Sequence, residues 1–463
     1  MVTADETRVG LALADKEAFG SNSPYFNESL LSQLIKKAMR EAGLGQKNPD
    51  VPLADIIEPG MSVLLKPNWV LHYNQSHHGT GDMDCMVTHP FFITAALKEV
   101  LAAKPSRVII ADAPIQSTRF EELPGMQLLK KTGAGSTPPV EIIDFRRDVV
   151  EKSGRVDSNR RGMENFILFD LGRDSLVEPI TESAGIFRNT DYDPRALAST
   201  HQPGRHQYLL AKEAFETDVI INLPKLKAHR KAGITAAIKN LVGINGNKGY
   251  LPHHRVGGSA QGGDCYEGSF FLKRLAEYFL DITNSRINKF DHSFWQFCVD
   301  GLIALQWLIA PNVTKSLEGS WFGNDTVWRM VLDLNRIALY GKIDGSMSPT
   351  PIRRVYSLTD GIVAGQRNGP LSPEPINLGA VTFASSSIFA DMAHAALMHF
   401  DWQKIPLLQH GLKSDITYPL VHNAAQKLKV YVDGKSYSFA ETAKLLGKDF
   451  LPPDGWKEHI ELK

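Results

Sequence analysis

The sequence has few cysteines, no excess of charge of either sign and no hydrophobic run long enough to cross a membrane. Its three cysteines, Cys85, Cys265 and Cys298, are an odd number, lie far apart and show no CxxC spacing. This pattern argues against a disulfide framework and against a cysteine-bound iron–sulfur cluster or structural zinc site. Lys plus Arg and Asp plus Glu are 51 each, so no overall field would attract nucleic acid or an anionic membrane surface.

The N-terminal segment lacks the features of a secretory signal, because it has acids where basic residues are needed and its apolar stretch is too short. With the scarcity of cysteine, this predicts a cytoplasmic protein. The most apolar segment, 294–310, is interrupted by Asp300 and Gln306 and followed by Pro311, which makes it too short and too polar to span a bilayer. It predicts a helix facing the core or a partner, with peripheral membrane contact as the alternative.

Short apolar runs alternate with helical patterns along much of the chain. Runs typical of buried strands occupy residues 61–65, 107–111, 140–143, 218–221 and 378–383, and helical patterns occupy 90–103 and 388–398. This rhythm predicts an α/β fold, a mostly parallel sheet flanked by helices. Residues 145–204 have no clear pattern.

Residues 266–345 differ from the rest of the chain in their pattern and their aromatic content, and they predict a helical insertion. Three helical patterns, at 269–283, 291–310 and 325–340, lie in a region that holds four tryptophans. The predicted organisation is therefore an α/β core over 1–265, an aromatic helical insertion over 266–345, and a return to the core with a C-terminal tail over 346–463.

Residues 222–255 combine seven Lys or Arg, four Asn and three His directly after a predicted strand. Ligands of open α/β sheets bind outside the carboxyl ends of the strands, so this segment predicts an anion-binding site. Lys225, Lys227 and His229 would lie on one side of an extended stretch. Thr235 and Lys239 would lie one turn apart on a helix whose N-terminal N–H groups favour an anion. The alternative is a solvated basic helix without a ligand.

Polar residues also follow the other predicted strands and could converge on the same rim of the sheet. The sequence LLKPNW supplies a lysine and an asparagine, and IIADAP supplies an aspartate. The predicted substrate-binding residues are Lys66, Asn68, Asp112, Lys225, Lys227, Thr235 and Asn240. The predicted catalytic residues are His229, Lys239 and Asp360. Asp360, in TDGIVAGQRNGP, could position a lysine, bind a cation or act as a base, and a turn-forming Asp before Gly is the alternative.

Two loops rich in His and Asp are candidate metal ligands. The first, HHGTGDMDCMVTH, contains His77, His78 and His89, with Asp84 and Cys85 between them. The second, LPHHRVGGSAQGGDC, offers the residues His253, His254, Asp264 and Cys265. The ligand types suit a divalent metal, although the spacing matches no strong motif. The alternative is that these residues form turns and hydrogen bonds.

Several segments resemble the domain of unknown function 362 family, in register from about residue 62 to residue 400. They are VLLKPNWV, VTHP, IIADAP, NLPKLKAHRKAGITAAIKNLVGI, SLTDGIVAGQRNGP and FADMAHAALM. The insertion with GNDTVWRMVLDLNR is similar to a subgroup associated with bacterial cell-surface polysaccharide gene neighbourhoods. Other members carry a ferredoxin-like cysteine module that this sequence does not contain, which argues against electron transfer.

The turn AGITAAIKNLVG is also similar to a turn of the nickel-pincer lactate racemase family, in which a lysine holds a covalent cofactor. This likeness implies Lys239 as the cofactor lysine, with His229 and either His253 or His254 as acid and base.

These observations predict an enzyme, an isomerase or lyase, that acts on a small anionic metabolite, carboxylated or phosphorylated and sugar-derived. Neighbouring ammonium groups would keep His229 neutral and able to transfer protons during isomerisation, epimerisation or elimination. Two other classes remain open: a non-catalytic metabolite-binding or assembly protein, and a metal-dependent hydrolase that uses His77, His78 or His89.

Overall fold

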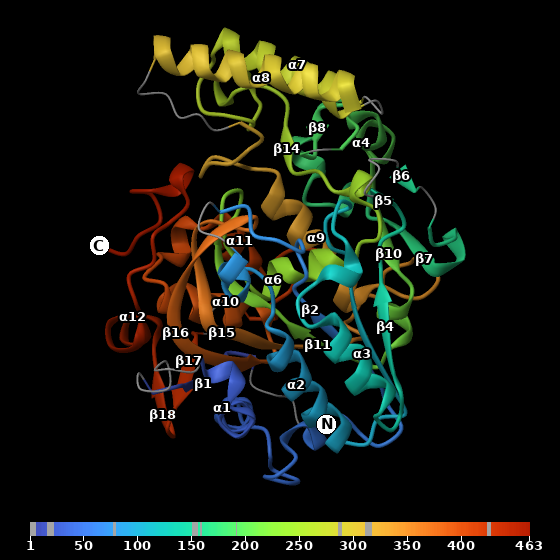
Figure 1. Ribbon diagram of the computed structural model, residues 1–463, viewed down its shortest axis with the longest axis vertical. Coiled ribbons are helices and arrows are strands. Elements are labelled where there is room, and N and C mark those ends of the chain that lie inside the picture. Colours follow the sequence, from blue (N-terminus) through green and yellow to red (C-terminus); the bar gives the residue numbers. More distant parts are fainter. Residues whose placement is uncertain are drawn as a thin grey trace.

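The structure is a computed structural model, and it describes residues 6–15, 23–76, 80–150, 156–157, 160–190, 192–285, 289–310, 317–423 and 427–463. A large twisted sheet forms its centre, helices cover both faces, and two long helices lie at one end (Figure 1). The predicted α/β class, with a mostly parallel sheet flanked by helices, is confirmed.

In the described part of the chain, the sheet has 11 strands in the order β18-β17-β1-β16-β15-β11-β2-β3-β4, with β12 and β13 paired beside β15. The strands are β1 (Arg8–Leu13), β2 (Ser62–Pro67), β3 (Arg107–Asp112), β4 (Val140–Asp144), β11 (Val219–Leu223), β12 (Lys225–His229), β13 (Gly233–Thr235), β15 (Arg354–Asn368), β16 (Ser372–Ala384), β17 (Lys429–Val432) and β18 (Lys435–Tyr437).

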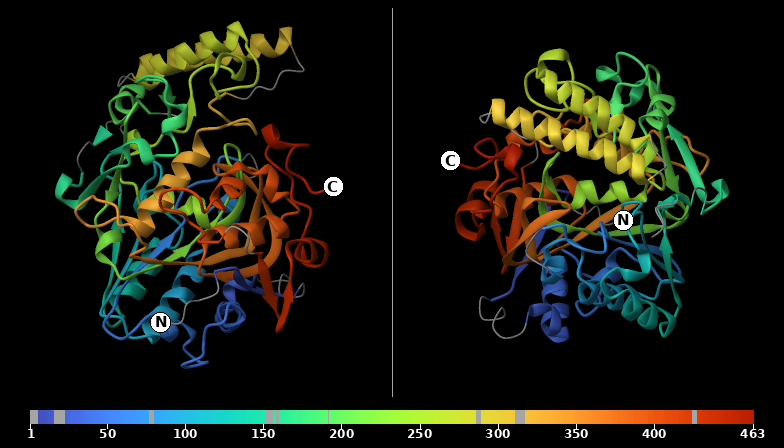
Figure 2. Two further views of the ribbon diagram at one scale, coloured as in Figure 1. Left: turned by 180° about the vertical axis from the view of Figure 1, so that it is seen from behind. Right: turned by 45° about the horizontal axis from the view of Figure 1, so that its top comes forward.

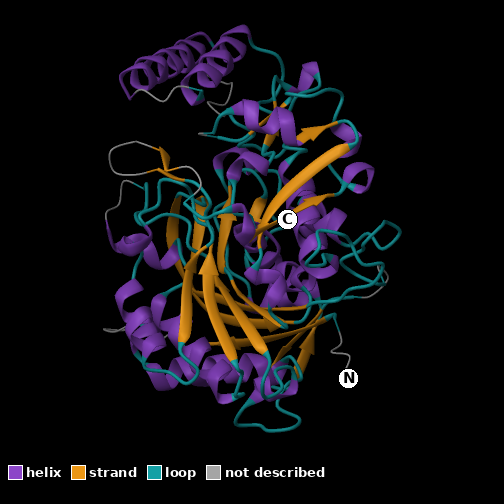
Figure 3. Ribbon diagram, turned by 90° about the vertical axis from the view of Figure 1, so that its right-hand side faces the viewer, coloured by secondary structure: helices purple, strands orange, loops and turns teal. Residues whose placement is uncertain are grey.

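The strands β4, β3, β2, β11 and β15 are mutually parallel, so their carboxyl ends meet at one edge of the sheet. The strands predicted at 61–65, 107–111, 140–143 and 218–221 are confirmed as β2, β3, β4 and β11. The run at 378–383 is also a strand, but β16 is antiparallel to both β15 and β1. Figure 3 shows the strands of the central sheet and the helices around them. Only residues 369–371 connect β15 to β16, and a parallel crossover needs a dozen residues or more.

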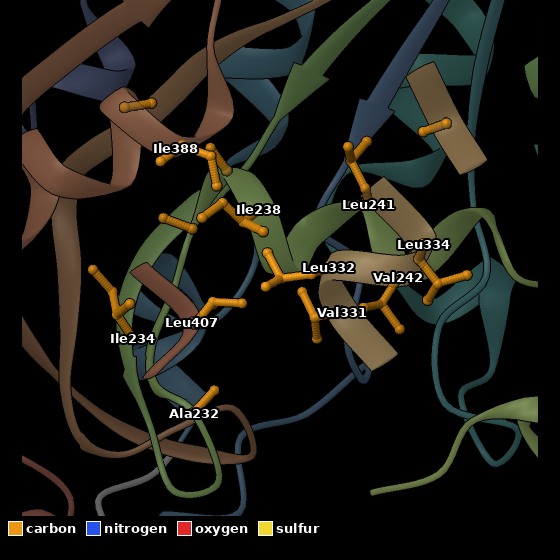
Figure 4. Packing of buried hydrophobic residues seen from close by; sticks show 14 of the residues in the cluster. Ala232, Ile234, Ile238, Leu241, Val242, Val331, Leu332, Leu334, Ile388 and Leu407 are labelled. Carbon is orange, nitrogen blue, oxygen red and sulfur yellow. The ribbon is translucent and has the colours of Figure 1, made fainter. Parts of the chain in front are cut away.

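Alternate residues of the central strands face two separate hydrophobic cores. Val63 and Leu65 pack on one face, whereas Leu64 packs on the other, as the two-residue period of a strand requires. The first face is covered by α1 (Glu28–Glu41), α2 (Pro90–Ala102) and α3 (Met126–Ala134). The second is covered by α6 (Ala237–Asn240), α9 (Val327–Tyr340), α10 (Ser387–Leu397) and α11 (Pro406–Gly411). Figure 4 shows side chains of the second core, among them Ile238, Leu332 and Ile388.

A layer of smaller elements packs beside the sheet. They are β5 (Val149–Val150), β6 (Val156–Asp157), β7 (Phe166–Asp170), β8 (Phe187–Arg188), α4 (Pro194–Thr200), β9 (His201–Gln202), β10 (Arg205–Ala211), α5 (Glu213–Glu216) and β14 (His254–Arg255). Near the C-terminus, α12 (Phe439–Leu446) packs against α10. Most of the stretch 145–204, in which the sequence predicted no element, belongs to this layer.

The three helices predicted in the insertion are confirmed as α7 (Phe271–Asn284), α8 (Lys289–Ile309) and α9. Helices α7 and α8 pack on each other at one end of the molecule (Figure 2), whereas α9 is almost entirely buried in the second core. The division at residues 266 and 345 remains a prediction. Within the described ranges, no helix is both long and apolar enough to cross a membrane. Large apolar side chains exposed on α7 and α8 are Phe271, Tyr278, Phe294, Phe297, Leu305, Trp307, Leu308 and Ile309.

Candidate functional site

A cavity of about 190 Å³ lies at the carboxyl edge of the sheet. It is lined by residues that follow β2 and β3, by β12 and β13, and by α6. The sequence-predicted residues that line it are Lys66, Asn68, Asp112, Lys227, His229, Thr235, Lys239, Asn240 and His253. Segments more than a hundred residues apart in the chain therefore bring their polar groups to one hollow, as parallel strands with a common edge require.

The described lining of this cavity has a large excess of positive charge. Five lysines line it, together with Arg230, whereas Asp112 is the one carboxylate among these residues. The lysines are Lys66, Lys227, Lys231, Lys239 and Lys248. Arg230, Lys231 and Lys248 belong to the basic segment 222–255, but no pattern in the sequence distinguished them from the other basic residues of that segment. Such a cavity suits an anionic ligand.

A hydrogen-bond network fixes two of the ammonium groups. Lys66 Nζ lies 2.7 Å from Asp112 Oδ1 and donates to Asn240 Oδ1 at 3.1 Å. Asn68 Nδ2 donates to the same oxygen of Asn240 at 3.0 Å, and Asn68 Oδ1 accepts from Lys227 Nζ at 2.7 Å. Asn68 and Asn240, which the sequence predicted to bind a substrate, hold the two lysines in place.

Gly243 allows this network to pack closely. A Cβ atom added at Gly243 would lie 1.9 Å from Asp112 Oδ1 and 2.6 Å from Lys66 Nζ. The backbone N–H of Trp69 donates to the other Asp112 oxygen at 2.7 Å. A side chain at position 243 would therefore displace the ion pair, which explains why glycine is needed where the chain passes over Asp112.

Burial lowers the pKa of three cavity lysines towards neutrality. The pKa of Lys227 and that of Lys239 fall to about 7, and that of Lys248 to about 8. Desolvation is the main cause in each case, and neighbouring ammonium groups lower the values further. Within the described residues, the ammonium of Lys239 forms no hydrogen bond or ion pair, so it is available to a ligand.

Two histidines of the cavity are held in opposite tautomers by the backbone. Nδ1 of His229 accepts a hydrogen bond from the backbone N–H of Lys231 at 3.0 Å, so a neutral ring carries its proton on Nε2. Nδ1 of His253 lies 2.9 Å from the carbonyl oxygen of Leu251. A carbonyl only accepts, so the neutral His253 ring carries its proton on Nδ1 and has a free lone pair on Nε2.

Both rings are neutral near pH 7. Burial lowers the pKa of His229 well below its usual value, and the ammonium of Lys239 lowers it further. Burial and the ammonium of Lys231 act in the same direction on the pKa of His253. The cavity therefore presents one N–H donor, from His229, and one basic nitrogen, from His253.

Lys225 and Asp360 do not line the cavity. Lys225 Nζ lies 2.6 Å from Asp360 Oδ2, and both side chains are fully buried. The hydroxyl of Tyr25 donates to Asp360 Oδ1 at 2.6 Å, and the backbone N–H of His89 donates to Oδ2 at 3.0 Å. The pairing of β12 with β15 shifts register between Lys225 and Lys227. Lys225 and Asp360 thus join β12 and β15 to the neighbouring segments.

The prediction that one helix carries both Thr235 and Lys239 is wrong in part. Thr235 ends β13, which pairs antiparallel with β12, and α6 spans only Ala237–Asn240. The first N–H groups of α6, from Ala237 and Ile238, donate to the carboxylate of Asp391 at 2.7 and 2.9 Å. This carboxylate occupies the place where the sequence predicted that a helix N-terminus would bind an anion.

The metal-ligand candidates that the structure describes do not form one site. His77 and His78 lie outside the described residues. His89 Nδ1 accepts from the backbone N–H of Phe91 at the start of α2, and its Nε2 lies 3.5 Å from Asp84. His254 and Cys265 lie together with Glu277, a residue that sequence analysis missed because it is in a helix with no metal motif. Asp264 accepts hydrogen bonds from Thr326 and other residues.

The fold and the cavity define an α/β protein with a lysine-lined cavity at the carboxyl edge of its sheet. Residues 148–396 match the family described as "Domain of unknown function (DUF362)", and the chain belongs to this family. The matched range contains His229, Lys239 and His253 but not Lys66 or Asp112, although the resemblance noted in the sequence began near residue 62.

No curated protein matches the chain. Among solved structures, the crystal structure of a Thermotoga maritima protein is similar, with 11% sequence identity, a TM-score of 0.33 and coverage of 76% of this chain. The match covers 54% of the Thermotoga maritima chain, about half of its length.

Proposed function

We propose that this protein is an enzyme that moves protons on a small anionic metabolite. The observation that carries the proposal is the pair of neutral histidines, one a donor and one an acceptor, in a single lysine-lined cavity. Removal of a proton from carbon next to a carboxylate needs a base, a group that supports the negative charge and a second proton carrier. The reaction class is isomerisation, epimerisation or elimination.

His253 is the base in this proposal. Its free Nε2 takes the proton from the substrate carbon and the ring becomes an imidazolium, while the electron pair of the broken C–H bond moves into the carboxylate. Its depressed pKa makes the neutral form available at physiological pH. The sequence assigned proton transfer to His229. The structure instead favours His229 as the donor, because its Nε2 carries the proton.

The lysines bind the anion and support the enolate. Lys239, whose ammonium has no partner among the described residues, is the first candidate to contact the substrate. A bound anion would stabilise the charged forms of Lys227 and Lys239, since each has a pKa of about 7 without it. In this proposal, the positive charge of Lys227 and Lys239 stabilises the electron pair that remains after the substrate C–H bond breaks.

A hydroxylated, sugar-derived acid suits the remaining lining of the cavity. Asn189, Thr190 and Tyr192 contribute amide and hydroxyl groups to the lining of the cavity. Thr190 Oγ1 accepts from Lys231 Nζ at 2.5 Å, which places a hydroxyl beside an ammonium. Groups of this kind select polyols by hydrogen bonding.

Exchange of substrate protons with solvent is the test, because all three reaction types begin with loss of a carbon-bound proton. The protein would be incubated in D₂O with a panel of sugar acids, hydroxy acids and their phosphates, and deuterium incorporation would be followed by NMR and mass spectrometry. We expect incorporation next to the carboxylate with at least one compound. His253→Gln should abolish the exchange, and His229→Gln should reduce it by about a hundredfold.

Binding must be measured in the same variants. His229→Gln and His253→Gln should keep most of the affinity for the compound that exchanges, whereas Lys239→Met should lose it. His422→Gln, a change of an exposed histidine, serves as the matched control. If compounds bind tightly but none exchanges, the protein is a metabolite-binding protein and the enzyme proposal fails.

A further inference from the structure

A second cluster of reactive side chains lies outside the cavity. It contains His254 from β14, Cys265 from the loop that follows, and Glu277 from α7. All three residues are buried, and one ligand-type atom of each lies within 4.8 Å of those of the other two. In the part of the chain that the structure describes, it is the one grouping of three such residues at this spacing.

The donor atoms of the cluster lie close together, and other groups engage them only in part. Nδ1 of His254 is buried and has no hydrogen-bond partner among the described residues. The backbone N–H of Glu318 donates to Cys265 Sγ at 3.2 Å. Burial and the Glu277 carboxylate nevertheless raise the pKa of this thiol well above its usual value, so a bound cation is needed to hold it as a thiolate. The backbone N–H of Gly257 donates to both carboxylate oxygens of Glu277 at 3.0 Å. A buried imidazole nitrogen without a partner is costly unless something binds it.

We propose that His254, Cys265 and Glu277 bind a Zn²⁺ ion. One imidazole, one thiolate and one carboxylate are the ligand types that zinc takes, with bond lengths of about 2.0–2.3 Å and a tetrahedral arrangement. The ligand atoms of such a site lie about 3.5 Å apart, so small side-chain rotations would draw the cluster together around the ion. A water molecule or the second Glu277 oxygen would complete the coordination.

The position of the cluster indicates a structural role. Helix α7 packs mainly on α8 rather than on the body of the protein. Its described links to the body include the ion pair of Arg188 with Asp281, at 2.7 Å, and the bonds from Gly257 to Glu277. An ion bound by both His254 on β14 and Glu277 on α7 would link the α7–α8 hairpin to the small sheet of β8 and β14.

The rival explanation is a polar cluster without metal. In that case, the Cys265 thiol donates to Glu277, and the buried ammonium of Lys273, which interacts with Cys265, balances the charge. The two explanations differ in whether the cysteine is a thiolate bonded to a cation, and cobalt reports this directly because a cobalt–thiolate bond has a charge-transfer absorption.

The full-length protein would be purified without chelator, its metal content measured by native mass spectrometry, and Co²⁺ then titrated into the metal-stripped protein. We expect about one zinc ion per chain and a thiolate-to-cobalt absorption band. Cys265→Ser should remove the band, and His254→Gln or Glu277→Gln should weaken binding by about a hundredfold or more. Cys298→Ser is the control, because Cys298 is on α8 and outside the cluster.

A second measurement on the wild-type protein guards against variants that fail to fold. Limited proteolysis should cut the α7–α8 hairpin faster after removal of the metal, and Zn²⁺ should restore protection. Absence of the cobalt–thiolate band in wild-type protein, or equal Zn²⁺ affinity in wild type and Cys265→Ser, would overturn the proposal. Cys265→Ser and Glu277→Gln leave the residues that line the cavity unchanged, so their result is independent of the proposed enzyme activity.

Discussion

Lys66 Nζ lies 2.7 Å from Asp112 Oδ1, and both side chains are almost completely buried. The two residues end the neighbouring parallel strands β2 and β3, so the pair exists only because those strands lie side by side. Burial lowers the pKa of Lys66, and the Asp112 carboxylate offsets part of this effect. The other described residues that line the cavity offer no carboxylate.

Asp112→Asn should reduce the free energy of unfolding by about 3–5 kcal/mol, because it leaves Lys66 buried without a counter-charge. The double variant Lys66→Met with Asp112→Asn should be more stable than Asp112→Asn alone. Denaturant unfolding would measure both. The exposed pair of Lys130 and Glu121, at 2.6 Å, provides the control, since Glu121→Gln should cost less than about 1 kcal/mol. If the losses of unfolding free energy in Lys66→Met and in Asp112→Asn add up to the loss in the double variant, the two residues are not a coupled pair.

Sulfate should bind the cavity more tightly at lower pH. Its charge does not change between pH 6 and pH 9, so any pH dependence comes from the protein. Lys227 and Lys239 have pKa values of about 7 and Lys248 about 8, and an anion favours their charged forms. Affinity should therefore fall by about tenfold or more as pH rises from 6 to 9. Titration calorimetry in buffers of different ionisation enthalpy would also show proton uptake on binding.

Lys239→Met should weaken sulfate binding and make its pH dependence shallower. Lys444→Met, a change of an exposed lysine on α12, should leave both unchanged. Sulfate affinity that is constant with pH in wild-type protein would show that these lysines do not form the anion site.

The ligand-free protein should become more stable as pH rises above 7. The folded-state pKa of Lys239 is lowered to about 7, whereas an unfolded lysine has a pKa of about 10.4. Between these values the unfolded chain binds more protons, so the free energy of unfolding rises with pH by up to about 1.4 kcal/mol per pH unit for this lysine. The slope in wild type minus that in Lys239→Met isolates its contribution, and equal slopes would contradict a lowered pKa.

Gly243→Ala should destabilise the protein by about 2 kcal/mol or more and weaken sulfate binding, because the new Cβ would meet Asp112 Oδ1 at 1.9 Å. Gly301→Ala is the matched control. Gly301 lies within α8, and a Cβ there meets nothing within 4 Å, so the change should be neutral or stabilise by up to about 1 kcal/mol. Thermal unfolding of the two variants beside wild type would measure the difference.

Local patterns were sufficient to predict the strands of the parallel core. The apolar runs that became β2, β3, β4 and β11 are short, continuous and followed by polar residues, which is the signature of a strand buried on both faces. The same rule located Lys66, Asn68 and Asp112 at one edge, since parallel strands share their carboxyl ends. The direction of β16 was not predictable from its own residues, because it depends on its short connection to β15.

Side-chain environments decided which members of the basic segment line the cavity. Lys225 and Lys227 are two residues apart in one strand, yet Lys225 pairs with Asp360 and Lys227 lines the cavity. His253 had been grouped with metal ligands because it adjoins His254, but the two rings lie in different sites. No sequence pattern indicated Glu277 as a metal ligand. Each of these outcomes depends on a partner far away in the sequence.

By itself, the sequence determined the α/β class, the strands of the parallel core and the basic segment that supplies about half of the cavity lining, because hydrophobic period and composition are local properties of the chain. Cytoplasmic location and the enzyme class remain predictions. Only the tertiary structure decided which lysine is paired and which is available, which nitrogen of each histidine carries a proton, and which three residues form the proposed zinc site. Burial, tautomer and pKa all depend on the groups that surround a side chain, and folding alone brings those groups together.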